Sequence, residues 1–278
     1  MAVVQTLSRL ARSSAAGVRE FARAGVDFVY PPVCCNCSAE LVDESAGGSS
    51  GSRLCDMCLA ALASLIERPC LRCGAPSGPH TDTTAGCIHC RRDHFAFETV
   101  VCLGVYQNEL RRACLRAKHP GGGPLAAALG RLLHRQRQAD LVRLRCDLIV
   151  AVPHHWTERW RHPHQASEIL ARTLADTLRS DYGGPILSKV RRTPAQASLP
   201  ASRRRTNLRG AFRARRRKDL SGAAVLLVDD VLTTGATSQE AAKSLLRAGA
   251  HRVAVAVAAR ALIHHGHQNT PQQRPAPA

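Results

Sequence analysis

The stretch Val225–Thr237, VLLVDDVLTTGAT, decides the fold. Its first four residues are apolar and predict a buried strand, and the acidic pair Asp229 and Asp230 stands at the carboxyl end of that strand. Two apolar residues follow, and then comes a loop made of Thr233, Thr234, Gly235, Ala236 and Thr237. Ligands of open α/β sheets bind at the carboxyl ends of the strands. The stretch therefore predicts a ligand site on a strand–loop–helix unit.

The chemistry of this unit suits a ribose carrying a 5-phosphate. Backbone N–H groups and threonine hydroxyls at a helix N-terminus attract phosphate, and Gly235 allows a close approach of the backbone. The two carboxylates suit ribose hydroxyls and Mg²⁺. A plain strand–helix junction is the alternative, with Thr237 as the N-cap and Glu240 completing a capping box. Capping explains neither the acidic pair nor the Thr-Thr-Gly sequence.

The segments on both sides of this unit alternate between strands and helices. The expected strands are Thr99–Tyr106, Asp147–Val152, Ile186–Val190, Ala223–Val228 and Arg252–Ala258. The expected helices are Glu109–Lys118, Leu125–Leu144, Ala166–Leu178 and Ser238–Ala248. Apolar strands that alternate with helices indicate an α/β fold with a parallel, doubly wound sheet.

A cysteine-rich module precedes this part of the chain. Eight of the 12 cysteines form four C-x-x-C pairs: Cys34 and Cys37, Cys55 and Cys58, Cys70 and Cys73, Cys87 and Cys90. Each pair supplies half of a tetrahedral zinc site, so the module predicts two structural zinc ions. The simplest pairing is sequential, the first two pairs for one ion and the last two for the other, and an interleaved pairing also fits the spacing.

The alternatives for these cysteines are disulfides, redox chemistry, or one retained zinc site with the other cysteines vestigial. Disulfides need an oxidising compartment, and four redox pairs in one short module are implausible. The module is poor in apolar residues, so we expect metal to replace a hydrophobic core there. Cys102, Cys114 and Cys146 lie in apolar segments and are expected to be small buried side chains.

Composition narrows the range of functions. The chain has 278 residues and a net charge of +18, which attracts polyanions such as nucleic acid or phosphorylated ligands. Aromatic residues make up only 4%, which argues against a base-stacking surface. No apolar stretch is long enough to span a membrane, and the N-terminus lacks the apolar core of a secretion signal, so we expect a cytoplasmic protein.

These patterns divide the chain into four parts. We expect an N-terminal helix within residues 1–33, a zinc-binding module over 34–93, the sheet domain over 94–263 and a disordered tail over 264–278.

Val225–Thr237 resembles the phosphoribosyl-pyrophosphate (PRPP) motif of type I phosphoribosyltransferases, and the chain as a whole resembles the ComF family. The residues that carry the wider resemblance are Tyr30-Pro31-Pro32, Tyr106, Lys118, Val152-Pro153, Arg159, Arg161, Gln165, Thr193-Pro194-Ala195-Gln196, Leu199, Arg204, Asn207 and Gly210-Ala211-Phe212. That family joins a zinc-binding module to a phosphoribosyltransferase-like domain and is linked to DNA uptake in competence and to the use of DNA as a nutrient.

The resemblance implies a role for each part of the site. Asp229 and Asp230 would hold the ribose hydroxyls, partly through Mg²⁺, and Thr233 to Thr237 would hold the 5-phosphate. The pyrophosphate loop would be Val152-Pro153-His154-His155. A flexible loop, Arg192 to Phe212, would close over the site with Gln196, Asn207 and the arginines Arg203, Arg204, Arg205 and Arg209. Lys118 would lie at the mouth of the site.

One segment departs from the family. Where the family commonly reads Arg-Gly-Phe-Asn-Gln, this chain reads Arg161-His162-Pro163-His164-Gln165. Pro163 fixes φ and removes a backbone donor, which changes the contacts expected on the acceptor side.

Two functions fit these features. The first is an enzyme that transfers the phosphoribosyl group of Mg²⁺-PRPP to a nitrogenous acceptor, mainly by positioning and charge stabilisation; no side chain stands out as a general base, so no catalytic residue is assigned. The second is a non-catalytic PRPP sensor or a partner of the competence machinery, in which Arg203–Arg205 and Arg213–Lys218 bind single-stranded DNA.

Overall fold

The computed structural model describes residues 31–41, 53–63, 66–154, 165–193, 207–215 and 220–262. The chain divides into two compact units, Met1–Ala60 and Ala61–Ala278, and each is described by itself. The helix expected before the first cysteine and the tail expected after residue 263 lie outside the described residues. No helix within the described ranges is long and apolar enough to cross a membrane.

The first unit carries the first two C-x-x-C pairs. The turn that follows Cys34 is closed by a hydrogen bond of 2.8 Å from the Ser38 N–H to the Cys34 carbonyl, and a β-bridge joins Val33 to Glu40. The other pair lies at the start of the short helix α2 (Asp56–Leu62).

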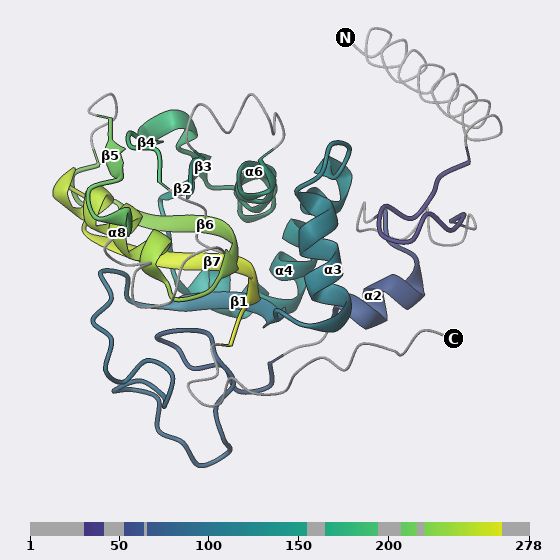
Figure 1. Ribbon diagram of the computed structural model, residues 1–278, viewed down its shortest axis with the longest axis horizontal. Coiled ribbons are helices and arrows are strands. Elements are labelled where there is room, and N and C mark those ends of the chain that lie inside the picture. Colours follow the sequence, from purple (N-terminus) through teal and green to yellow (C-terminus); the bar gives the residue numbers. More distant parts are fainter. Residues whose placement is uncertain are drawn as a thin grey trace, which may run out of the picture. The chain divides into compact units, whose positions relative to one another are not determined.

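A parallel sheet of five strands forms the centre of the second unit. The strands lie in the order β1 (Val100–Val105), β7 (Arg252–Arg260), β6 (Ala224–Leu232), β2 (Leu148–Ala151) and β3 (Asp181–Tyr182) (Figure 1). Every pairing in this sheet is parallel. The central strands β6 and β7 are almost entirely buried, as expected for apolar strands covered on both faces. The parallel α/β sheet predicted from the sequence is confirmed.

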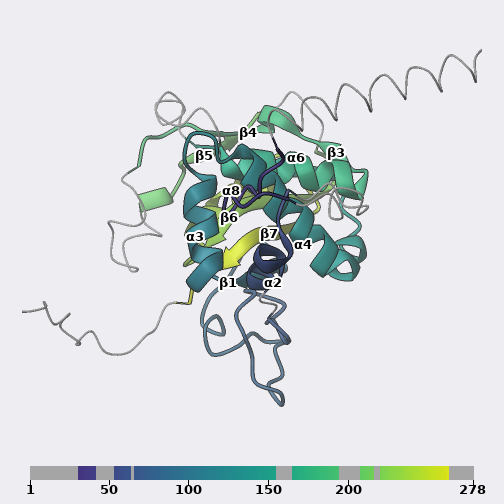
Figure 2. The same ribbon diagram turned by 90° about the vertical axis from the view of Figure 1, so that its right-hand side faces the viewer.

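Helices cover both faces of this sheet. They are α3 (Asn108–Ala117), α4 (Gly123–Arg143), α6 (Ala166–Leu178) and α8 (Ala236–Arg247). The connections from β1 to β2 and from β2 to β3 run across the sheet in one direction, and the connection from β6 to β7 runs in the other. Right-handed crossovers therefore place α4 and α6 on one face, where they pack together, and α8 on the opposite face (Figure 2).

The two central strands are longer than the sequence pattern predicts. Strand β6 continues through the acidic pair to Leu232, because its backbone stays paired with β7 up to Arg260. A small antiparallel sheet, β4 (Leu187–Lys189) with β5 (Phe212–Ala214), stands next to a 3₁₀ turn at Gly184–Ile186. The sequence predicted only β4 of this small sheet. Strand β5 has three residues, which are too few to show an alternation of apolar and polar side chains.

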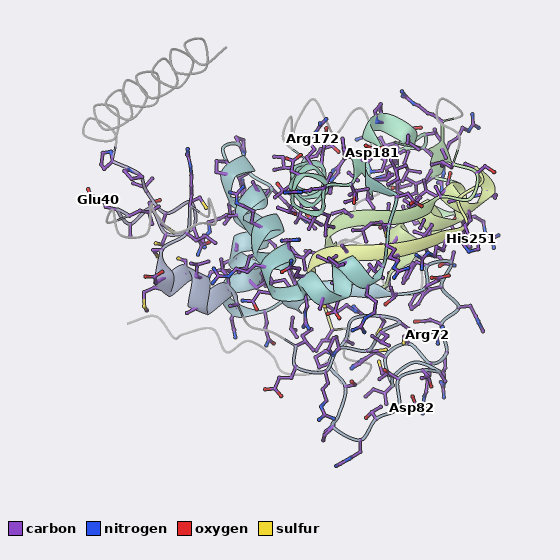
Figure 3. The ribbon with its side chains drawn as sticks, turned by 180° about the vertical axis from the view of Figure 1, so that it is seen from behind. Glu40, Arg72, Asp82, Arg172, Asp181 and His251 are labelled. Atoms are coloured by element: carbon purple, nitrogen blue, oxygen red, sulfur yellow. The ribbon has the colours of Figure 1, made fainter. Side chains whose placement is uncertain are left out.

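The second pair of C-x-x-C motifs belongs to the sheet unit. It lies in the segment 66–99, which the described structure shows as turns and bends with no helix or strand before β1. Figure 3 shows Arg72 and Asp82 on this irregular segment, with sulfur atoms near Arg72. Two hydrogen bonds of Arg72, to the carbonyls of Ala85 and Asp93, help to hold it in shape. The domain boundaries at residues 33 and 93 remain predictions.

Helices α4 and α6 are in close contact at Gly130. A Cβ atom on Gly130 would lie 3.0 Å from the Cβ of Thr173 and 3.1 Å from its Cγ2. Those distances are shorter than normal van der Waals contact, so the glycine sets the spacing of the two helices.

We predict that Gly130→Val destabilises the second unit by about 1–3 kcal/mol, because it overpacks this contact. In thermal unfolding, this corresponds to a melting temperature lower by several degrees. The matched control is Gln138→Val, which places the same side chain at an exposed position of the same helix. Equal melting temperatures for the two variants would contradict the prediction.

Candidate functional site

The strand order of the sheet creates a crevice between β2 and β6. These strands are neighbours, yet the chain leaves β2 towards β3 and leaves β6 towards β7 on the other side. This is the topological switch point of an open α/β sheet, where the connecting loops separate and ligands bind. The segments that follow the two strands are Val152–His154 after β2 and Thr233–Gly235 after β6.

Strand β6 extends beyond its neighbour β2 at this crevice. The last paired residues are Ala151 and Val228, followed by one hydrogen bond of 2.8 Å from the Val152 N–H to the Val228 carbonyl. The next N–H on the side that faces β6 is that of His154, and it donates instead to the Oε1 of Gln165 at 3.3 Å. The next two residues of β6 are Asp229 and Asp230, so both carboxylates stand where the strand has lost one of its partners.

The two carboxylates differ in their environments. Asp230 forms an ion pair of 2.8 Å between its Oδ2 and the Nζ of Lys118, which follows the last turn of α3. Asp229 accepts a hydrogen bond of 2.9 Å from the Asp230 N–H. Burial, and then the nearby charge of Asp230, raise the pKa of Asp229 to about 8. Burial alone would lower the pKa of Lys118, but the charge and the hydrogen bond of Asp230, together with the charge of Asp229, outweigh it and raise that pKa.

The loop after β6 forms the N-terminus of α8. Gly235 is the N-cap at φ +75°, in the left-handed region, and a Cβ there would lie 3.2 Å from the ring of Phe95. The helix begins at Ala236, whose N–H donates to the Thr234 hydroxyl at 3.3 Å. The expectation that Thr237 caps the helix is wrong, because Thr237 lies inside the first turn. Glu240 instead accepts from the N–H of Gly210 and from Lys243.

Two residues at the N-terminus of α6, Gln165 and Ser167, hold the loop after β2 in place. Gln165 is only 7% exposed, and its Oε1 accepts a hydrogen bond of 3.3 Å from the His154 N–H. The hydroxyl of Ser167 donates to the Val152 carbonyl at 3.0 Å. The structure thus brings Val152, His154 and Gln165 together on the β2 side of the crevice.

The two ends of the expected flexible loop lie beside the small sheet. Arg191 donates hydrogen bonds to the carbonyls of Asn207 and Arg209, at 2.7 and 2.9 Å. The other sequence-predicted residues of the site lie outside the described ranges: His155, Arg159, Arg161, Gln196, Arg203, Arg204 and Arg205.

The eight cysteines of the C-x-x-C pairs form two clusters. The sulfur atoms of each lie within 4.8 Å of one another, and the groups are Cys34, Cys37, Cys55, Cys58 and Cys70, Cys73, Cys87, Cys90. This is the sequential grouping. Four sulfurs at about 2.3 Å from a tetrahedral zinc ion stand about 3.8 Å apart. The separations of Cys37–Cys55, Cys70–Cys90 and Cys73–Cys87 are 3.7, 3.8 and 3.6 Å.

Zinc fits both clusters and disulfides do not. A disulfide requires sulfurs about 2.05 Å apart, and all of these cysteines are free thiols. All four residues of the second cluster are buried, and a hydrogen bond from the Cys73 thiol is the main cause that lowers the pKa of Cys70 to about 4. A thiolate at neutral pH is the form that binds metal.

The second cluster is joined to the loop after β6 by residues that sequence analysis did not single out. Phe95 stacks on Phe97 with ring centroids 4.5 Å apart and covers Gly235. Gln239 of α8 donates to the His94 carbonyl at 3.1 Å and accepts from the Ala96 N–H. Arg260, at the end of β7, donates to the Cys73 carbonyl at 2.7 Å. The sequence holds one hint of this role for Arg260: it is a charged residue at the end of a strand in which residues 253–259 are all apolar.

Comparison with known proteins agrees with this architecture. The family model for the phosphoribosyl transferase domain matches residues 163–273. The DNA utilization protein YhgH of Salmonella typhi is 32% identical over 207 residues, which cover 73% of this chain and 88% of that protein. The protein of the same name from Escherichia coli K12 is 30% identical with the same coverage. The chain belongs to the ComF family.

A further relative comes from Haemophilus influenzae. Its competence protein F is 30% identical over 183 residues, which cover 63% of this chain and 78% of that protein. The matched ranges confirm the resemblance that the sequence motifs predicted.

We predict that this ComF protein carries two zinc ions per chain. Cys70→Ser combined with Cys73→Ser should leave one ion and lower the melting temperature of the sheet unit, because the second cluster is part of that unit. Elemental analysis by mass spectrometry and thermal unfolding measure the two effects.

Cys146→Ser is the control for this experiment, since Cys146 is a half-buried cysteine outside both clusters. It should keep both ions. Protein purified without chelators that contains no zinc would contradict the prediction.

We predict that Asp229→Asn stabilises the ligand-free ComF protein at pH 8. Between the ordinary aspartate pKa of 3.8 and the folded value of about 8, the folded state holds a proton that the unfolded state has released. Stability therefore falls as the pH rises through this window, and asparagine avoids the loss. In magnesium-free buffer, the variant should melt at least about 2 °C above wild type at pH 8, with the gap closing towards pH 4. A gap that does not change with pH would refute this account.

Proposed function

We propose that this protein binds Mg²⁺-PRPP in the crevice at the carboxyl ends of β2 and β6 and acts in the utilisation or uptake of DNA. The observation that carries the proposal is the acidic pair next to the N-terminus of α8 at the switch point. The names of the relatives, DNA utilization protein and competence protein, support the biological role.

The proposed reaction is the transfer of the phosphoribosyl group to a nitrogen acceptor. The bond between C1 of the ribose and the pyrophosphate oxygen breaks, the bond from C1 to the acceptor nitrogen forms, and the acceptor releases a proton to solvent. The reaction needs no protein nucleophile, so its rate depends on positioning and on stabilising the pyrophosphate that leaves. Mg²⁺ supplies part of that charge stabilisation.

Each part of the crevice has a task in this proposal. The carboxylates of Asp229 and Asp230 accept hydrogen bonds from the ribose hydroxyls, and Asp230 exchanges its ion pair with Lys118 for contacts to the ligand and its cation. The N–H groups that begin α8 hold the 5-phosphate. Val152–His154 lie where the pyrophosphate leaves. Zinc at the two cysteine clusters has a structural role, since four thiolates leave no open position.

A second candidate function is binding of single-stranded DNA, and one surface favours it. Helix α3 exposes Arg111, Arg112 and Arg116 and is followed by Lys118 at the site. With a net charge of +18 on the chain, this exposed basic face of α3 suits a phosphodiester backbone. The face and the crevice are joined at Lys118, so both functions can reside in one protein.

The test of PRPP binding is calorimetric titration of zinc-loaded protein with PRPP, with and without Mg²⁺. We expect saturable binding that depends on Mg²⁺. Asp229→Asn together with Asp230→Asn should weaken it at least about 100-fold, because two charged hydrogen-bonding groups are lost. No heat at millimolar PRPP would overturn the proposal.

The matched control is Asp147→Asn. Asp147 precedes β2 and lies beside the first residue of β6, at the end of the sheet away from the crevice. Its Oδ2 accepts a hydrogen bond of 2.9 Å from the Ala224 N–H, and the side-chain oxygen of asparagine can accept the same bond. This variant should bind PRPP as wild type does. Anisotropy with a labelled single-stranded oligonucleotide over a series of salt concentrations separates the second candidate. The double variant should keep its DNA affinity; if it does not, the two sites overlap.

A further inference from the structure

The side chain of Arg260 lies buried at the carboxyl end of the sheet. Arg260 is the last residue of β7, in register with Leu232 of β6 on one side and with Val105 of β1 on the other. Only 6% of the residue is exposed. A fully charged guanidinium at such a position needs hydrogen bonds and a compensating negative charge.

Main-chain carbonyls from two distant segments satisfy this guanidinium. Its Nε donates to the carbonyl of Cys73 at 2.7 Å. Its Nη1 donates to the carbonyls of Leu232 and Thr233, at 3.1 and 2.5 Å, and to that of Ala261. Cys73 belongs to the second cysteine cluster. Thr233 is the first residue of the loop Thr233–Thr237, the phosphate loop, which is expected to hold phosphate. One side chain thus connects the metal cluster directly with the loop expected to hold phosphate.

The second cysteine cluster can supply the compensating charge. Within the described part of the chain, no carboxylate lies at ion-pair distance from Arg260. Four thiolates around one Zn²⁺ carry a net charge of −2, and Cys73, whose carbonyl Arg260 contacts, is one of the four ligand residues. With zinc bound, the cluster would supply the balancing charge from the Cys73 side of the guanidinium, whereas Thr233 accepts from its Nη1.

A second connection runs parallel to the first. Gln239 of α8 bonds to the backbone of His94 and Ala96, just after the last cysteine of the cluster, and Phe95 covers Gly235. Leu262, two residues beyond Arg260, packs against the same cysteines. Both C-x-x-C pairs of the second cluster are thus connected to the phosphate loop: the first through Cys73 and Arg260, and the last through the residues that follow Cys90.

We propose that Arg260 is a positioning residue that couples metal binding at the second cysteine cluster to ligand binding at the phosphate loop. The guanidinium fixes the Thr233 carbonyl and so orients the N–H groups that follow it. The inference rests on the proposed function, because the ligand through which we test it is PRPP. Coupling is reciprocal: if zinc in this cluster raises the affinity for PRPP, PRPP must raise the affinity for that zinc by the same factor.

The experiment measures zinc release from the full-length protein to a chelating dye, with and without saturating Mg²⁺-PRPP. We expect PRPP to slow the loss of one of the two ions about tenfold, within the usual range of such couplings, and to leave the other unchanged. The double variant Asp229→Asn with Asp230→Asn, at the same PRPP concentration, corrects for zinc taken up by PRPP itself.

Arg260→Gln should bind PRPP at least about tenfold more weakly than wild type and should lose the protection of zinc. Arg260→Lys keeps the charge but not the planar fork that spans several carbonyls, so it should restore zinc retention more than PRPP affinity. The matched control is Arg252→Gln. Arg252 is the first residue of the same strand, at its other end, and it donates to the carbonyls of Leu144 and Arg145, at 2.6 and 3.5 Å. This variant should keep the protection.

The outcomes separate the two proposals. If wild-type protein shows no PRPP binding by calorimetry, the proposed function fails and the coupling fails with it. If wild type binds PRPP but PRPP leaves both rates of zinc release unchanged, only the coupling is wrong. Equal PRPP affinity and equal zinc protection in wild type and Arg260→Gln would also overturn it. The wild-type measurement needs no variant, so it decides the question even if Arg260→Gln does not fold.

Discussion

The parallel pairing of β6 with β2 and β7 is the constraint on which the rest of the structure depends. Because Val225–Val228 are buried between both neighbours, the register of β6 cannot slip without exposing the core. That register sets the position at which the ladder with β2 ends, after the bond from the Val152 N–H to the Val228 carbonyl. The backbone of β6 then continues with β7 as its strand partner, and within the described residues the acidic pair has no strand beside it on the β2 side. A buried apolar run and the unequal lengths of β2 and β6 together create the crevice.

The second cysteine cluster does for the segment 66–99 what a hydrophobic core does for the sheet. This segment has turns in place of helices and strands, and its buried centre consists of the four cysteines and Ala75. It is anchored to the sheet by polar contacts of particular residues. Arg137 binds the Ile66 carbonyl where the segment begins, Cys102 donates its thiol to the Gly74 carbonyl at 3.2 Å, and the Val100 N–H bonds to Leu71. Loss of the metal would therefore affect the wall of the site as well as the segment.

Much of this arrangement could be predicted from the sequence, because it depends on local patterns. Alternation of apolar strands and helices indicated the parallel sheet, and C-x-x-C spacing indicated the metal-binding pairs. The ion pair of Lys118 with Asp230 depends on how α3 lies over the sheet, which no local pattern encodes. The same holds for Arg260 and Cys73, which are 187 residues apart. The extension of β6 through Asp229 and Asp230 was hidden as well, because carboxylates are poor strand formers and only pairing with β7 keeps them extended.

The carboxyl ends of β6 and β7 hold two ionisable groups of opposite sign, the half-buried Asp229 and the buried Arg260, and neither forms an ion pair within the described residues. Asp229 lies beside a like charge, which opposes its ionisation. Arg260 is bonded to carbonyls alone among the described residues. Replacing either charge by an apolar residue would remove the cost of burying it. Both positions make physical sense if the missing balance comes from outside the chain, a metal cluster for Arg260 and the hydroxyls and cation of a ligand for Asp229. On this argument, the sheet end stays electrostatically incomplete until metal and ligand are both bound, and Thr233 stands between the two charges.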